Sequence, residues 1–327
     1  MSAGADPPAE VRVGVFGTGA LGQHHVRILA ELPGAELVGV YDTRLEVARA
    51  VAERHGVRVF QSAEALSAEI EAAVAAVPTA AHAELGGALL ERGAHLLVEK
   101  PIASSLAEAD RLIAAAAAAG RVLAVGHVEF FNPAVQALLT ALAEPGAGAR
   151  FVEVQRLARF TPRSLDVDVV LDLMIHDLQI LHALDSSPVA EVRATGIDVL
   201  SPRIDIANVR IELASGCAAN LTASRVSADR VRKLRVFGPA RYFSLDYQDQ
   251  EVKGFRLEEG GGERRILPTD LPVEKAEPLR RELEAFLAAC RGEEAGPGGG
   301  GEAAHIVTGR EGRRALATAL AVVEAIG

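Results

Sequence analysis

Cross-linking residues are scarce in this sequence. Its 327 residues include two cysteines, Cys217 and Cys290, and neither lies in a CxxC motif or in a cysteine–histidine cluster. We therefore expect neither a disulfide framework nor a structural zinc site, and we assign no metal to the protein. This sparing use of cysteine fits a reducing cytoplasm.

Long apolar runs and basic runs are missing as well. The first apolar run, Val11–Phe16, is much shorter than a membrane span or the apolar core of a signal peptide. The formal net charge is −10, and the sequence has no long run of Lys or Arg that could follow a phosphate backbone. We expect a cytoplasmic protein that binds neither membranes nor nucleic acid.

Apolar residues, in contrast, suffice for two domains, since hydrophobic residues make up 49% of the chain. Up to residue 125, apolar strand segments alternate with helical segments, which is typical of a parallel, doubly wound α/β sheet. Later strands are joined by short turns, which indicates an open, mainly antiparallel sheet covered by helices on one face. We predict an NAD-binding Rossmann domain over 1–127 and an α+β domain for substrate binding and oligomerisation over 128–327.

The periodicity also gives the expected elements. The first domain should contain strands at 11–16, 36–41, 57–60, 72–77, 95–98 and 122–125, and helices at 22–32, 45–55, 63–68, 81–92 and 106–119. The second should contain strands at 151–159, 189–199, 206–213, 218–226, 234–237, 242–247 and 252–257, and helices at 133–142, 169–184, 277–290 and 311–326. The glycine-rich residues 296–301 should form a flexible loop.

A glycine motif marks the expected cofactor site. The segment Gly17-Thr-Gly-Ala-Leu-Gly22 has GxGxxG spacing, follows a strand and begins a helix. The first glycine allows a tight turn, the second lets the backbone approach a pyrophosphate, and the third permits close packing of helix on strand. Asp42, 20 residues after Gly22, could accept hydrogen bonds from an adenosine ribose. The alternative is a structural glycine turn followed by a surface aspartate.

The choice of cofactor depends on two neighbouring side chains. A carboxylate at Asp42 repels a 2′-phosphate and favours NAD, whereas Arg44 could bind that phosphate. Because the two residues act in opposite directions, we expect NAD as the cofactor and NADP as the less favoured one.

The first candidate catalytic residue is a lysine that follows the expected strand at 95–98. Lysine occurs four times in the chain and arginine 30 times, so the lysine of Glu99-Lys100-Pro101 is conspicuous. An ammonium is a compact donor whose pKa shifts readily on burial, whereas a guanidinium stays charged and planar. We therefore expect a chemical role for Lys100 at the sheet edge where open α/β folds bind ligands. An ordinary exposed lysine is the alternative.

The second candidate is a carboxylate–imidazole pair. Asp172 and His176 are four residues apart in an expected helix, so the carboxylate could orient the imidazole. Alcohol oxidation needs a base for the hydroxyl proton, and histidine titrates near neutrality. The two residues could instead be a simple surface pair on the helix.

These motifs resemble those of the glucose-fructose oxidoreductase/inositol dehydrogenase family in order and spacing. The resemblance spans nearly the whole chain and rests on the glycine motif, Pro78-Thr79 with His82, Glu99-Lys100-Pro101, Gly126-His127, and Asp172 with His176. It implies a Rossmann domain followed by an open-sheet domain, with Lys100, Asp172 and His176 meeting beside the nicotinamide. The cofactor-binding residues that it implies are Gly17, Gly19, Ala20, Leu21, Gly22, Asp42, Pro78, Thr79, His82 and Glu99.

Within that family, the sequence is most similar to the UDP-N-acetylglucosamine 3-dehydrogenases. The similarity lies in segments 126–133, 166–177, 205–208 and 220–225. Such enzymes oxidise the sugar 3-hydroxyl to a ketone, which an aminotransferase converts to an amine for lipid A or O-antigen assembly. Phe130 stands where they commonly have arginine, so any substrate contact from that arginine is absent or supplied elsewhere.

The phosphates of a UDP sugar need hydrogen-bond donors. Four arginines are expected to face the cofactor crevice or to be solvated surface residues: Arg156, Arg159, Arg163 and Arg225. Asn132 could hydrogen-bond the sugar, or it could cap the helix that starts at Pro133. We assign Asn132, Arg159 and Arg163 to substrate binding.

Self-association is expected through the second sheet. In the strand around 241–247, Tyr242 alternates with Phe243 and Tyr247, so aromatic side chains point to both faces. Helices can cover one face only, and an exposed apolar face favours a dimer or tetramer.

The resemblance thus implies NAD-dependent oxidation of the 3-hydroxyl of a UDP-N-acetyl sugar. One alternative is a dehydrogenase or reductase for another polyol or cyclitol, because the catalytic residues do not encode the group attached to the sugar. A second is a non-catalytic NAD-binding regulator on the same fold. The sequence leaves open the sugar, the position oxidised, the net direction, and the choice between dimer and tetramer.

Overall fold

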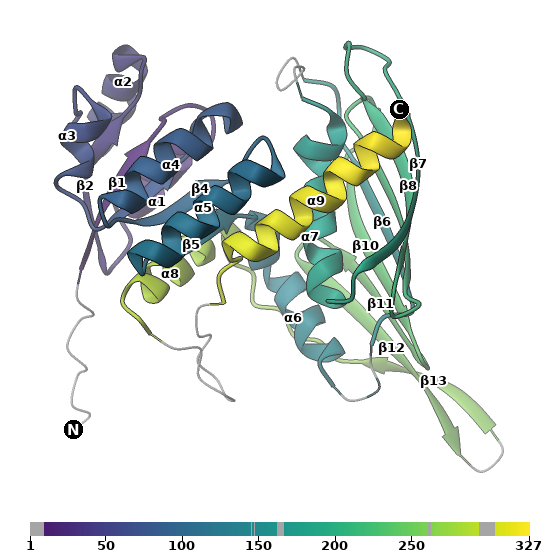
Figure 1. Ribbon diagram of the computed structural model, residues 1–327. Coiled ribbons are helices and arrows are strands. Elements are labelled where there is room, and N and C mark those ends of the chain that lie inside the picture. Colours follow the sequence, from purple (N-terminus) through teal and green to yellow (C-terminus); the bar gives the residue numbers. More distant parts are fainter. Residues whose placement is uncertain (1–9, 145, 147, 162–166, 261–262, 294–304) are drawn as a thin grey trace, which may run out of the picture. The chain divides into compact units, whose positions relative to one another are not determined.

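The computed structural model describes residues 10–144, 146, 148–161, 167–260, 263–293 and 305–327 (Figure 1). The expected loop at 296–301 lies outside these residues. By their contacts these residues form two compact units, the first from 10–127, 279–293 and 305–313 and the second from the described part of 128–278 together with 314–327. Residues 279–293 and 305–313 thus belong to the first unit, although the expected second domain includes them.

The first unit contains a parallel five-stranded sheet with the order β2-β1-β3-β4-β5. Its strands are β1 (Val11–Phe16), β2 (Ala35–Tyr41), β3 (Ala72–Ala75), β4 (His95–Glu99) and β5 (Leu123–Gly126). Its helices include α1 (Gly22–Leu29), α2 (Leu45–His55), α3 (Ala63–Ser67), α4 (His82–Glu91) and α5 (Leu106–Ala119). The predicted doubly wound Rossmann sheet is confirmed. Strand order reverses between β1 and β3, the place where such sheets bind ligands.

Two features of the first unit differ from the expectation. Residues 57–60 form an isolated bridge from Val59 to Val40 and not a strand. Helix α8 (Pro278–Cys290) comes from late in the chain, yet its Leu283, Phe286 and Leu287 are buried in the same core as β1 and α1. Apolar periodicity predicts such a helix but not the sheet against which it packs.

The second unit contains an eight-stranded sheet with the order β13-β12-β11-β10-β6-β9-β8-β7. Its strands are β6 (Phe151–Leu157), β7 (Val189–Ile197), β8 (Ile206–Leu213), β9 (Ala218–Ser224), β10 (Val231–Gly238), β11 (Arg241–Asp246), β12 (Glu251–Gly260) and β13 (Glu263–Thr269). All neighbours are antiparallel except β6 and β9. The predicted open sheet is confirmed, but β13 was not expected, because it is rich in charge and largely exposed and contains Pro268.

One face of this sheet is covered by helices. Helices α6 (Pro133–Leu142), α7 (Ile175–Leu184) and α9 (Gly309–Ile326) lie along it (Figure 1), and their apolar residues share one core with alternate residues of the strands. Phe243 and Leu245 are buried there.

The opposite face of the sheet carries a row of aromatic side chains. Phe151, Phe237, Tyr242 and Phe255 are paired across four adjacent strands, with ring centroids 5.0–6.1 Å apart. In the part of the chain that the structure describes, no helix is long and apolar enough to cross a membrane.

Candidate active site

The glycine loop follows β1 at the point where the strand order reverses. Gly17 has a φ of 86°, and a Cβ there would lie 2.4 Å from the carbonyl oxygen of Ala76. A Cβ on Gly22 would lie 1.9 Å from the carbonyl oxygen of Gly17, so both positions require glycine. A Cβ placed on Gly19 would have Nη2 of Arg44 as its nearest neighbour, 3.9 Å away. The loop therefore leaves open space at Gly19, where a pyrophosphate would approach, beside the exposed Ala20 and Leu21.

Asp42 ties the glycine loop to the end of β2. Its Oδ2 accepts hydrogen bonds from the Thr18 N–H at 2.8 Å and the Thr18 hydroxyl at 3.2 Å, and its Oδ1 accepts one from the Arg44 N–H at 2.9 Å. Burial alone would raise the pKa of Asp42, but these donors outweigh burial and hold the pKa below its usual range. The residue stays anionic at neutral pH and lies at the position expected for a ribose contact.

Two predicted cofactor contacts are corrected to supporting positions. His82 is 1% exposed, and its two ring nitrogens lie 2.9 Å from the carbonyl oxygens of Val77 and Pro101, so no ring nitrogen remains for a ligand. Glu99 is also buried, and its Oε1 lies 2.7 Å from Nε2 of His25. Both side chains hold neighbouring segments in place. The sequence does not show this for Glu99, because His25 lies 74 residues away along the chain.

Pro78 is exposed and Thr79 half-buried, and both remain candidates for cofactor contacts.

Lys100 is half-buried and is followed by a cis peptide bond to Pro101. Several ionisable groups surround it in the first unit. Burial, together with the charge of Lys100, lowers the pKa of His127 to about 3, so this imidazole is neutral. Burial favours the acid form of Glu99, but His25 and Lys100 hold its pKa below the usual range. Helix α8 adds Glu282, whose pKa is raised well above its usual value by burial and by Glu99.

The segment with Asp172 and His176 departs from the expected regular helix. Residues Val170–Met174 form a π-helical turn, η3, which leads directly into α7. The wider turn changes the four-residue spacing on which the pairing of Asp172 with His176 was predicted. Both residues are half-buried, and they lie on either side of the buried Met174 and Ile175 in the sequence. π-helical turns recur at functional sites, where they re-aim side chains.

Asp177, directly after His176, was not singled out by the sequence. It is 2% exposed and forms a two-pronged ion pair with Arg156 of β6, with both distances 2.7 Å. Arg156 also donates to Oε1 of Glu129 at 2.8 Å. Among the described residues, no group of three or more His, Cys, Asp or Glu side chains is arranged to hold a metal ion.

The comparisons with known proteins show the family to which the chain belongs. Residues 11–127 match the family model described as "Oxidoreductase family, NAD-binding Rossmann fold". The UDP-N-acetylglucosamine 3-dehydrogenase of Acidithiobacillus ferrooxidans is 37% identical over 322 residues, or 97% of each chain. The chain belongs to the glucose-fructose oxidoreductase/inositol dehydrogenase family. As a member of this family with an NAD-binding Rossmann fold, the protein is an NAD(P)-dependent oxidoreductase.

Other relatives support the same family. A solved structure of the UDP-N-acetylglucosamine 3-dehydrogenase from A. ferrooxidans has a TM-score of 0.87 and 36% identity, covering 97% of this chain and 98% of that one. Inositol 2-dehydrogenase 1 from Saccharopolyspora erythraea is 31% identical over 310 residues, covering 88% of each chain. Membership therefore holds for both units of the chain.

The substrate residues expected from this family resemblance fall into different environments. Asn132 is 2% exposed, caps α6 through the Ala134 N–H at 3.1 Å and donates to the carbonyl oxygen of Tyr247 at 3.0 Å. This corrects its assignment to substrate binding, because the capping alternative holds. Arg159 is exposed and donates to the carbonyl oxygen of Ala228 at 2.8 Å, so it remains a candidate. Arg163 lies outside the described residues.

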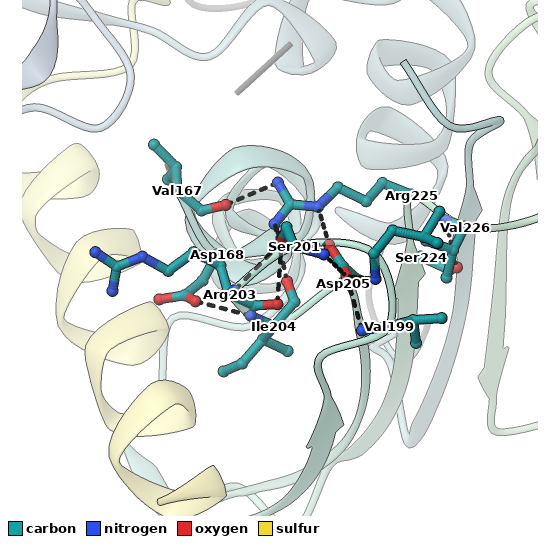
Figure 2. Close-up of polar contacts among 11 residues, drawn as sticks. Val167, Asp168, Val199, Ser201, Arg203, Ile204, Asp205, Ser224, Arg225 and Val226 are labelled. Atoms are coloured by element: carbon teal, nitrogen blue, oxygen red, sulfur yellow. Dashed lines mark hydrogen bonds and ion pairs between the residues drawn. The ribbon is translucent and has the colours of Figure 1, made fainter. Parts of the chain in front are cut away.

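Two of the other arginines are buried rather than facing a crevice. Arg156 and Arg225 are 2% and 5% exposed, and each is paired with a buried aspartate. Figure 2 shows Arg225 enclosed by Asp205, Ser201 and Val167. Neither guanidinium can therefore reach a phosphate as expected.

Proposed function

We propose that the protein catalyses NAD-dependent oxidation of the 3-hydroxyl of a UDP-N-acetyl sugar, with UDP-N-acetylglucosamine as the favoured substrate. The observation that carries this proposal is the similarity over 97% of the chain to a protein named for that reaction. The residues that the reaction needs are present, with the glycine loop and Lys100 in the first unit and Asp172 and His176 in the second, and Lys100, Asp172 and His176 are each half-buried.

The residues of the first unit fit a bound dinucleotide. Gly19 offers an approach free of side chains at the N-terminus of α1, and Asp42 offers a carboxylate for a ribose diol. Arg44 is mostly exposed, and its Nε lies 3.7 Å from Asp42, which partly offsets the repulsion of a 2′-phosphate. We infer a preference for NAD over NADP. When bound, the nicotinamide supplies the acceptor for the hydride that leaves the sugar carbon.

The other steps belong to the protein's own side chains. His176 accepts the hydroxyl proton through its imidazole, and Lys100 donates a hydrogen bond to the same oxygen, which favours charge development there. Asp172 orients His176 or the sugar. Proton removal by this base allows the carbon–hydrogen bond to break as the carbonyl forms.

The test is NADH formation on a panel of nucleotide sugars and free polyols. We expect absorbance at 340 nm to rise with UDP-N-acetylglucosamine and to stay flat with N-acetylglucosamine or myo-inositol. Turnover of the free polyols without UDP would support the second candidate, a polyol or cyclitol dehydrogenase. That candidate is favoured by the 31% identity to an inositol 2-dehydrogenase.

We further propose that the protein forms a dimer or tetramer through the eight-stranded sheet, in the cytoplasm. The aromatic row on its uncovered face includes Phe237 and Phe255, each 37% exposed, and such a surface is commonly covered by a second copy. Light scattering at micromolar concentration should give a multiple of 34.3 kDa. A mass equal to one chain would contradict the oligomer. Both cysteines are free, which suits a reducing compartment.

A further inference from the structure

Two buried arginine–aspartate pairs flank the segment that carries Asp172 and His176. The pairs are Arg156 with Asp177 and Arg225 with Asp205, and all four side chains are at most 6% exposed. Neither pair can contact a substrate directly. Replacing a buried ion pair with apolar residues often leaves a protein equally stable. Stability alone therefore does not explain why two such pairs occur here.

The first pair fixes the end of the segment. Nε and Nη2 of Arg156 donate to Oδ2 and Oδ1 of Asp177, each at 2.7 Å, and this fork sets both the position and the rotation of the carboxylate. Because Asp177 is bonded directly to His176, the backbone of His176 is held against β6.

The same arginine continues into a network. Its Nη1 donates to Oε1 of Glu129 at 2.8 Å, and Arg232 donates to that oxygen at 3.2 Å. The Tyr247 ring lies 5.0 Å from the Arg156 guanidinium. Burial opposes its charge, but Asp177 and Glu129 raise the pKa of Arg156 well above its usual value, so it stays charged.

The second pair fixes the beginning of the segment, as Figure 2 shows. The Asp205 carboxylate accepts a hydrogen bond from Nε of Arg225 at 2.7 Å. It also accepts hydrogen bonds from the main-chain N–H groups of Val199, Leu200 and Ser201 at 2.6–2.9 Å. Nη1 of Arg225 donates to the carbonyl oxygen of Val167 at 2.8 Å.

The loop that Asp205 holds reaches the segment a second time. The Ile204 N–H donates to Oδ1 of Asp168 at 3.1 Å, and the Val169 N–H donates to the carbonyl oxygen of Ile204 at 2.9 Å. Residues 167–169 are therefore held through both Arg225 and Ile204.

Between these two fixed ends lies the π-helical turn Val170–Met174. A π turn is rare and less regular than the α-helix that the sequence favours, so the surrounding structure must hold it. We propose that the two pairs form a clamp, Arg225–Asp205 at the start and Arg156–Asp177 at the end, that positions Asp172 and His176. The clamp rests on the proposed function only for the role of His176 as base; its effect on the placement of His176 is independent of the substrate.

The test uses the full-length protein and two readouts. The first is the rate at which diethylpyrocarbonate labels His176, measured by peptide mass spectrometry with the exposed His24 as internal reference. The second is turnover with UDP-N-acetylglucosamine and NAD. In Asp177→Asn we expect labelling of the half-buried His176 to rise about threefold or more, because local opening becomes easier. We expect kcat to fall about 10- to 100-fold with little change in KM, since a small misplacement of a catalytic group is costly.

Two further variants distinguish loss of the positioning contact from loss of charge and from a failure to fold. Arg156→Lys keeps the charge but loses the fork, and should also raise His176 labelling. The double variant Arg156→Met with Asp177→Leu removes both charges of the pair and leaves Glu129 with Arg232 as its remaining partner, so it should fold and still label faster.

Asp185→Asn is the matched control. Asp185 lies at the other end of α7, where it accepts the Ser187 N–H at 2.9 Å, so this change should lower the melting temperature and leave His176 labelling and kcat unchanged. Unchanged His176 labelling in Asp177→Asn and in the double variant would overturn the clamp, whatever the turnover. An inactive wild type would overturn the proposed function instead, and the labelling result would still decide the clamp.

Discussion

In the first unit, the glycine loop is held mainly through main-chain N–H groups, since Thr18 and Arg44 donate theirs to Asp42. In the second unit, the segment around His176 is held by buried charges, with Arg156 and Arg225 each paired to an aspartate. Every residue except proline has a main-chain N–H group to donate, whereas a charge pair needs two particular side chains that the fold brings together. Substitutions in the first unit should therefore affect the cofactor, and those in the second should affect chemistry.

Lys100 offers the strongest way to break that comparison, because it belongs to the first unit yet is proposed to act in chemistry. Lys100→Met should abolish turnover and leave the Kd for NAD within a few-fold, since it removes a donor from the reacting oxygen and none from the pyrophosphate site. Calorimetric titration with NAD and steady-state kinetics measure the two effects. Weakened NAD binding with normal turnover would reassign Lys100 to the cofactor.

His176→Ala tests whether a substitution in the second unit affects chemistry and not cofactor binding. We expect turnover to fall about 10²- to 10⁴-fold near neutral pH, the range for loss of a general base, with the Kd for NAD unchanged. Stopped-flow measurement of NADH formation would give the rate. A variant that keeps full activity would make His176 a structural residue.

Asp42→Ala removes the side chain to which the main-chain N–H groups of the first unit donate. The change removes the carboxylate that repels a 2′-phosphate and also the acceptor of the Thr18 N–H, so we expect discrimination against NADP to erode by about 10-fold or more. The ratio of kcat/KM for NAD and NADP measures it. Equal use of both cofactors by the wild type would show that Arg44 outweighs Asp42.

The smallest expected effect concerns stability at low pH, because each unit contains a buried histidine with a strongly lowered pKa. Burial lowers the pKa of His182 in the second unit to about 4 and that of His127 in the first to about 3. Below pH 6.5 the unfolded chain binds protons that the folded chain does not, so stability falls as the pH falls toward 4. His182→Gln should remove about 1.4 kcal/mol per pH unit from this slope, as measured by urea unfolding. An unchanged slope would mean that His182 titrates normally.

The parts of the fold and site that were predictable from sequence are those with a local cause. The glycine motif requires Gly17 because of its own positive φ and Gly22 because a Cβ there would meet the carbonyl oxygen of Gly17, and Asp42 follows 20 residues after Gly22. Strand alternation likewise predicted both sheets. β13 escaped because its charged residues and Pro268 give no apolar pattern.

The remainder depended on contacts between distant residues. Arg156 and Arg225 look like solvent-exposed phosphate donors until the fold places Asp177 and Asp205 against them. Glu99 looks like a ligand contact until His25, 74 residues away, is found beside it. For Asn132, a cap and a sugar contact require the same side chain, and only its burial distinguishes them.

The most direct test of the proposed reaction follows the hydrogen that leaves the sugar. UDP-N-acetylglucosamine deuterated at C3 is incubated with NAD and the purified protein, and the reduced cofactor is analysed by mass spectrometry beside a sample made from substrate deuterated at C4. Oxidation at C3 predicts deuterated NADH from the first substrate and unlabelled NADH from the second. Unlabelled NADH from the C3-deuterated sugar, or no NADH from either, would contradict it.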